Sequence, residues 1–184
     1  MVRPGPAPAP LSVVARRVVD GGKGRTVKQL RIMAGDATGP QAKGPKIIGH
    51  VCNDIGGWGK GFVLALSKRW PEPEKEFRAW HRRRSGNDFG LGAVQLVQVR
   101  PDTWVANMVA QRGIRTGSGG PPIRYDALER CLAALGGHAL ALEASVHMPR
   151  IGCGLAGGKW SRVEPLVTGA LCARDVAVTV YDHA

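Results

Sequence analysis

Two glycine-rich segments carry the clearest chemical signal in the sequence. The first covers residues 56–61 and the second covers residues 151–158. Each follows an apolar run typical of a strand and precedes a segment with helical spacing. Loops of this kind present backbone N–H groups and a helix N-terminus to phosphate oxygens. Two such loops that face one crevice are suited to a diphosphate.

Neither segment matches the common nucleotide-binding loops. No Gly-Lys-Ser/Thr follows at the spacing of a Walker loop, and no Gly-x-Gly-x-x-Gly follows the first expected strand. Glycine-rich segments are also ordinary turns. By composition alone, a phosphate-binding role and a simple turn therefore both stay open.

The elements that must position these loops alternate between strand and helix. We expect the last helix to start at Ser161 as N-cap, with Glu164 at the distance of a capping box. The alternation predicts an α/β fold with a central mixed sheet and helices on both faces. Ligands of such folds bind at the carboxyl ends of the strands, where both glycine segments would lie. The expected strands are 27–33, 46–52, 93–99, 104–109, 145–148 and 176–181, and the expected helices are 62–70, 73–84, one from 123 that is interrupted at 136–137, and 161–173.

Composition limits the class of protein. A chain of 184 residues fits one domain, and its longest apolar runs are too short to cross a membrane. The four cysteines lie tens of residues apart with no CxxC pair, so we expect reduced thiols in a cytoplasmic monomer without a metal or cofactor. We expect residues 1–26 to be a disordered or loosely packed basic leader and residues 27–184 to be the domain.

The net charge of +12 is high for this length. Residues 1–30 hold six Lys/Arg and one acid, so much of the excess lies in a short leader. A nucleic-acid partner and a merely solvated basic surface both fit the charge. No recognition motif or alternation of aromatic and basic residues favours a dedicated nucleic-acid binding protein.

Three strings together resemble the macrodomain family in order and spacing. They are Gly-Asp-Ala-Thr at 35–38, His-Val-Cys-Asn-Asp leading into the glycine segment at 50–61, and Met-Pro-Arg-Ile-Gly-Cys-Gly-Leu at 148–155. The resemblance covers roughly residues 28–183 and is closest to the subfamily of the terminal ADP-ribose protein glycohydrolase and the DNA ADP-ribose glycohydrolases, in a bacterial stand-alone form. It implies a three-layer α/β/α fold and ADP-ribose as ligand. The implied partner is mono-ADP-ribosylated protein, with ADP-ribosylated DNA as a second carrier.

The resemblance also implies which residues contact the ligand. Asp36, with Ala37 beside it, matches the acid that accepts a hydrogen bond from the adenine amino group, although an Asp after Gly also caps turns. Tyr181 stands where such folds place an aromatic ring near adenine, and simple packing of this ring is equally compatible with its position. The remaining implied contacts are Gly57, Trp58, Gly59, Gly61, Phe62, Gln111, Arg112, Gly152, Cys153, Gly154 and Leu155.

Two positions depart from the catalytic pattern of that subfamily. Its lysine at the end of the hairpin strand is Gln111 here, and its aspartate after Gly-Cys-Gly-Leu is Ala156. Glutamine cannot form a Schiff base and alanine cannot transfer a proton, so a covalent-lysine mechanism at these positions is excluded. We expect hydrolysis to use Asn53 on the ribose hydroxyls, Asp54 as the base for water, and Lys60 near the diphosphate or ribose.

Three functions remain open from the sequence. The first is hydrolysis of ADP-ribose from the acidic side chains of a modified protein or from nucleic acid. The second is a non-catalytic reader of ADP-ribose, which the loss of both catalytic side chains favours. The third is a phosphatase acting on ADP-ribose 1″-phosphate. We expect His50 and His147 to be hydrogen-bonded core residues, and Cys153 to serve the backbone geometry of its loop.

Overall fold

The computed structural model describes residues 27–182. Its six-stranded sheet has the order β1-β6-β5-β2-β4-β3, in which β3 runs antiparallel to β4 and every other neighbouring pair is parallel. The basic leader predicted at residues 1–26 lies outside the described residues. The strands are β1 Arg31–Ala34, β2 Lys46–Asn53, β3 Val94–Arg100, β4 Thr103–Gln111, β5 Ser145–Pro149 and β6 Val178–Asp182.

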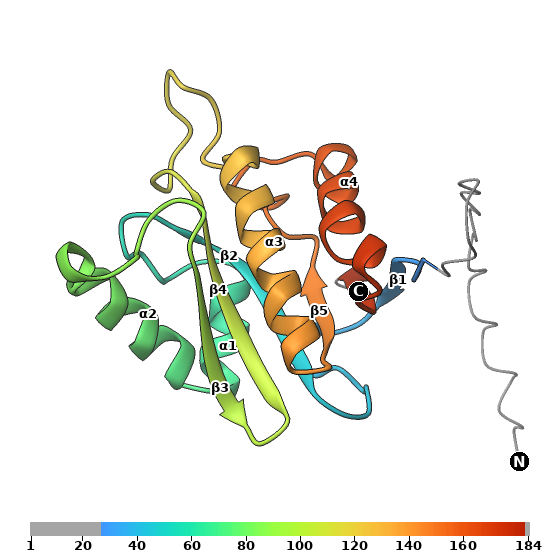
Figure 1. The fold of residues 1–184 in the computed structure, drawn as a ribbon. Helices are drawn as coiled ribbons and strands as arrows, with labels where there is room; N and C mark the ends of the chain where they lie inside the picture. Colours follow the sequence, from blue (N-terminus) through green and yellow to red (C-terminus); the bar gives the residue numbers. More distant parts are fainter. Residues whose placement is uncertain (1–26, 183–184) are drawn as a thin grey trace, which may run out of the picture.

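Helices cover both faces of the sheet, as predicted (Figure 1). Helices α3 and α4 bury one face in a core around Leu128, Leu132 and Met148, and α1 and α2 bury the other around Leu66 and Phe77. The four helices are α1 Phe62–Arg69, α2 Glu72–Arg82, α3 Tyr125–Ala141 and α4 Trp160–Ala170, with short 3₁₀ turns η1 Arg84–Gly86 and η2 Cys172–Arg174. None of the helices in the described part is long and apolar enough to cross a bilayer.

The first strand differs from the expectation. A half-buried strand was expected over residues 27–33, but β1 contains only Arg31–Ala34 and all four residues are exposed. It lies at the edge of the sheet, where it pairs with β6 alone. The alternation of residue types indicated a strand correctly, but it did not reveal that this strand is an edge strand with little cover.

The expected interruption of the third helix at glycines 136 and 137 was wrong. Helix α3 continues through both of them to Ala141. A Cβ on Gly136 would lie 2.8 Å from Arg174 Nη1 and 2.9 Å from the carbonyl oxygen of Ala170. The glycine therefore allows α4 and η2 to approach the helix closely, and this gain outweighs its weak helix propensity.

The start of the last helix was also predicted incorrectly. Helix α4 begins at Trp160, so Ser161 lies inside the first turn, and the residue at the N-cap is Lys159, whose side chain makes no capping hydrogen bond. The backbone N–H of Lys159 instead donates to the Tyr125 hydroxyl at 3.0 Å. A tertiary contact with α3 thus takes the place of the expected local capping box.

Two histidines are buried and hydrogen-bonded in the core, as expected from the sequence. His50 Nε2 lies 2.6 Å from Asn107 Oδ1, and His147 lies between Ser145 Oγ at 2.8 Å and the Tyr181 hydroxyl at 3.0 Å. Burial lowers the pKa of each imidazole from 6.5 to about 4. Both rings are therefore neutral in the fold at neutral pH.

We expect the free energy of unfolding to decrease as the pH falls from 6.5 towards 4. In this window the unfolded chain binds protons on both histidines while the fold does not, and each residue accounts for a loss of about 3 kcal/mol. The fold therefore has its full stability with respect to these two groups above pH 6.5, and it loses this stability as the pH falls to about 4. Urea unfolding at a series of pH values measures it. His50→Gln should reduce the slope by about one proton, and an unchanged slope would contradict this assignment.

Candidate functional site

Four loops meet at one edge of the sheet. They follow β1, β2, β4 and β5, which all run parallel and so end on the same side. The loop after β4 extends furthest from the body of the molecule (Figure 1). The site predicted from the sequence therefore has its parts at one edge, and the four loops cover residues 35–38, 54–61, 112–122 and 150–159.

Asn53 holds the first glycine loop in shape. Its side-chain Nδ2 donates to the Gly57 carbonyl oxygen at 2.8 Å, and its Oδ1 accepts from the Gly57 and Ile55 amides at 2.8 and 3.2 Å. The side chain is buried, so its amide serves the loop in this structure. Contact of Asn53 with a ribose hydroxyl remains a prediction.

The outer part of this loop leaves backbone donors open. Within residues 27–182, the amides of Gly59, Lys60 and Gly61 donate no hydrogen bond. Phe62 begins α1 directly after them, so the positive end of the helix dipole points at the same place. The Lys60 side chain is exposed beside these amides. This part of the loop can bind an anion.

The second glycine loop is a compact double turn. Gly157 N–H donates to the Gly154 carbonyl at 3.0 Å, and Gly158 N–H donates to the Gly152 carbonyl at 2.8 Å. The amides of Gly154 and Leu155 donate no hydrogen bond within the described chain. These two amides are therefore a second set of open donors.

The two glycine loops approach each other. Leu155 is 67% exposed, and its Cδ1 lies 3.5 Å from the position that a Cβ on Gly61 would take. Cys153, the residue before Gly154, has a thiol whose pKa is raised by burial, which disfavours the nucleophilic thiolate. The two loops thus lie next to each other at this edge of the sheet, and the role of Cys153 in the loop backbone remains a prediction.

Asp36 forms a turn at the β1 end of this edge. Its carboxylate accepts hydrogen bonds from the Thr38 amide and hydroxyl, each at 2.8 Å, and lies 3.7 Å from Arg69 Nη2. Ala37 beside it is buried, whereas the Asp36 side chain remains 56% exposed. The carboxylate caps its own turn and is still accessible to a ligand.

Tyr181 lies behind this turn. Its ring is close to Gly35, where an added Cβ would be 3.2 Å from Tyr181 Cδ1, and its hydroxyl meets His147. The side chain is 9% exposed, and burial raises the pKa of its phenol. Packing of the ring is thus evident, and contact with adenine remains a prediction.

Asp54 lies at the other end of the edge, between β2 and β4. Its Oδ1 accepts the Gly113 amide at 2.7 Å, and its backbone amide donates to the Gln111 carbonyl at 2.9 Å. Its second carboxylate oxygen has no hydrogen-bond donor within residues 27–182. Arg112 is exposed on the neighbouring loop. One oxygen of Asp54 is thus held by the Gly113 amide, and the other is open.

Ala156 is buried within the second glycine loop. It is 2% exposed within the α3 core, and its carbonyl accepts the Ile123 amide at 3.0 Å. Gln111, the other departure from the catalytic pattern, is partly buried at the end of β4. The methyl group of Ala156 therefore packs in the core and offers no proton-transferring atom to the site.

Sequence reasoning missed one residue that contacts the first glycine loop. Arg78 on α2 donates to the carbonyl oxygens of Gly56 and Trp58, at 3.4 and 3.0 Å. The only signal in the sequence was its i,i+4 spacing from Glu74, which indicates a helix-surface ion pair and no loop contact.

Within residues 27–182, no group of His, Cys, Asp and Glu side chains is arranged to hold a metal.

A mixed sheet between two helical layers, with open amides at the carboxyl ends of its parallel strands, defines an α/β/α module with its backbone donors at the edge where such folds bind ligands. No family model matches the chain. A solved macrodomain protein from Streptomyces coelicolor is 58% identical over 85% of this chain and 100% of its own, with a TM-score of 0.77. The chain belongs to the macrodomain family.

Two curated relatives extend the comparison. The chromodomain-helicase-DNA-binding protein 1-like of Danio rerio is 33% identical over 163 residues, which are 83% of this chain and 15% of that protein. The chain thus spans less than a fifth of that relative's length. The human ADP-ribose glycohydrolase OARD1 is 36% identical over 58 residues, which are 31% of this chain and 38% of that protein.

Proposed function

We propose that this macrodomain binds ADP-ribose at the described edge and hydrolyses it from mono-ADP-ribosylated protein or from nucleic acid. The observation that carries the proposal is the convergence of two glycine loops whose outer amides are open. Amides from both sides suit a diphosphate, which is the central anionic group of ADP-ribose. The activity in the name of the human relative supports the same ligand.

The ligand would lie across the edge from β1 to β4. Asp36 would accept the adenine amino group at one end, and the loops carrying Gly59 and Leu155 would hold the diphosphate in the middle. The distal ribose would then lie near Asp54 and Arg112. This order matches the order of the strands, in which β2 separates β5 from β4.

Hydrolysis would use water rather than a lysine nucleophile. Asp54 accepts a proton from water through its open oxygen while the water oxygen bonds to C1″ of the distal ribose. The C1″–O bond to an acidic side chain breaks, and its electron pair leaves with the carboxylate. Lys60 and Arg112 balance the phosphate charge. Gln111 and the buried Ala156 support this route over the covalent one.

A panel of three substrates tests the proposal. The protein is incubated with auto-modified mono-ADP-ribosylated protein, ADP-ribosylated DNA and ADP-ribose 1″-phosphate, and product is measured beside calorimetric binding of ADP-ribose. Release of free ADP-ribose supports hydrolysis. Tight binding without turnover supports a non-catalytic reader, which Gln111 and Ala156 favour. Release of phosphate supports the phosphatase, and no binding of ADP-ribose overturns the proposal.

Replacement of Asp36 by Asn should weaken ADP-ribose binding about 10-fold, because a charged acceptor for the adenine amino group is lost. The Asn oxygen can still accept the Thr38 amide, so the turn should persist. Calorimetry with inosine-diphosphate ribose, which lacks the amino group, gives the matched comparison. For that ligand the variant should bind at least as well as the wild type, because the Asn Nδ2 can donate to the hypoxanthine carbonyl and a carboxylate cannot. An equal loss for both ligands would mean that Asp36 does not read the amino group.

A further inference from the structure

A closed ring of hydrogen bonds joins the first glycine loop to α1 and α2. Trp58 Nε1 donates to Ser67 Oγ at 2.9 Å, and Ser67 donates to Glu74 Oε2 at 3.0 Å. Arg78 Nε donates to Glu74 Oε1 at 2.9 Å, and its Nη2 returns to the Trp58 carbonyl at 3.0 Å. Both helices are thereby tied to one residue of the loop.

The indole of Trp58 fixes one end of this hydrogen-bonded cycle, because it is packed in the core. It is 8% exposed in the α1–α2 core, with its centroid 5.3 Å from that of His50 and 5.5 Å from that of Phe77. Arg78 and Glu74 are only partly exposed, at 42% and 32% of their side chains. The planar guanidinium can serve three acceptors at once, which an ammonium group could not do in a fixed geometry.

The carbonyls that Arg78 binds determine where the neighbouring amides point. A trans peptide directs its N–H opposite to its C=O. In the peptide between Gly56 and Gly57, Arg78 holds the carbonyl and Asn53 accepts the N–H at 2.8 Å from the other side. In the peptide between Trp58 and Gly59, Arg78 again holds the carbonyl, and the N–H of Gly59 has no acceptor within residues 27–182.

We infer that Arg78 is a positioning residue that turns the Gly59 amide towards the diphosphate of the ligand without touching the ligand itself. The inference rests on the proposed function. Without Arg78, the Trp58–Gly59 peptide loses the donor to its carbonyl and is free to rotate. This peptide then has to be ordered when the ligand binds, and the entropy lost in ordering it lowers the affinity for the diphosphate.

Arg78→Met tests the inference, because it keeps a long apolar stem and removes every donor. We expect ADP-ribose affinity to fall roughly 10- to 100-fold, while the much weaker binding of adenosine, which has no phosphate, is unchanged. Addition of ADP-ribose should shift the Gly59 amide resonance in wild type and much less in the variant. Arg82→Ala, which removes one exposed charge from the last turn of the same helix, is the matched control and should bind as wild type does.

Two further readouts keep the test decisive. Circular dichroism and thermal melting show whether Arg78→Met folds, and Arg78→Lys replaces it if it does not. Lysine keeps the charge but cannot fork between two carbonyls, so it should recover only part of the affinity. Wild-type affinity and a wild-type Gly59 shift in a folded variant overturn the inference. Failure of the wild-type protein to bind ADP-ribose overturns the proposed function instead.

Discussion

Asp54→Asn should bind ADP-ribose with wild-type affinity but release it from modified protein at least about 100-fold more slowly. A loss of this size is usual when a positioned general base is removed. The asparagine oxygen can still accept the Gly113 amide, which Asp54 holds at 2.7 Å, so the junction of β2 and β4 should keep its shape. Only proton acceptance by the second oxygen is lost. Single-turnover release of ADP-ribose from auto-modified protein measures the rate, and calorimetry measures the affinity.

The matched control for this variant is Asp126→Asn, which removes an exposed carboxylate on α3 that pairs with Arg130. It should leave rate and affinity unchanged. Full activity of Asp54→Asn would show that Asp54 is not the base. Borohydride reduction during turnover then separates the remaining routes, because an adduct at Lys60 would reveal a lysine nucleophile at a new position.

The strand-loop-helix units of this chain could be predicted from the sequence because their signals are local. The run at 46–52 is apolar and β-branched, and the glycine segment after it can only be a loop, so the end of the strand near Asn53 could be predicted. The order of parallel strands then required both glycine loops to share one edge. The family strings added the ligand, which no local pattern could specify.

The roles of Asn53 and Asp54 could not be separated in the same way. Both follow the strand, and both carry oxygen atoms suited to a ribose or a water molecule. The partner that fixes Asp54 is the amide of Gly113, which lies 59 positions further along the chain. Asn53 instead bonds within its own loop. Only the packing of β4 beside β2 distinguishes a loop-forming side chain from one with an open oxygen.

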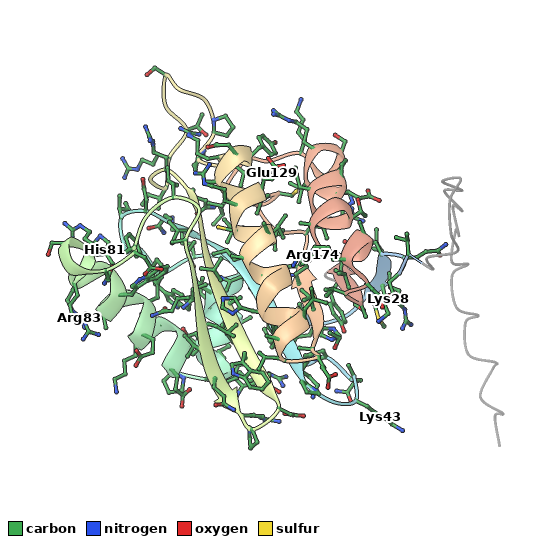
Figure 2. All side chains as sticks on the ribbon, viewed as in Figure 1. Lys28, Lys43, His81, Arg83, Glu129 and Arg174 are labelled. Atoms are coloured by element: carbon green, nitrogen blue, oxygen red, sulfur yellow. The ribbon has the colours of Figure 1, made fainter. Side chains whose placement is uncertain are left out.

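Glycines were ambiguous for a related reason. A glycine in the sequence can mark a turn or a close approach, and the two have different consequences. Gly56 does both, because its φ is +72° and a Cβ there would lie 2.4 Å from His81 Nδ1. His81 is on the last turn of α2, as Figure 2 shows from its labelled side chain. The close approach of His81 to Gly56 depends on tertiary packing, which periodicity does not encode.

Gly158→Ala should disrupt the second loop strongly. The new Cβ would lie 2.4 Å from the carbonyl oxygen of Gly152, a backbone atom that cannot move aside as a flexible side chain can. The hydrogen bond that Gly158 donates to that same carbonyl must then open. We expect the free energy of unfolding to fall by about 2–4 kcal/mol and ADP-ribose affinity to fall at least about 10-fold. Urea unfolding and calorimetry measure the two losses.

Gly154→Ala is the control within the same loop, because a Cβ there meets no heavy atom within 4 Å. Its stability should stay within about 0.5 kcal/mol of wild type. The pair separates a general intolerance of side chains in this loop from the specific closure between Gly158 and Gly152. Equal, small effects at both positions would show that the closure is dispensable. A large loss at Gly158 alone would instead show that the open amides of Gly154 and Leu155 depend on a backbone contact behind them, just as we infer that the Gly59 amide depends on Arg78.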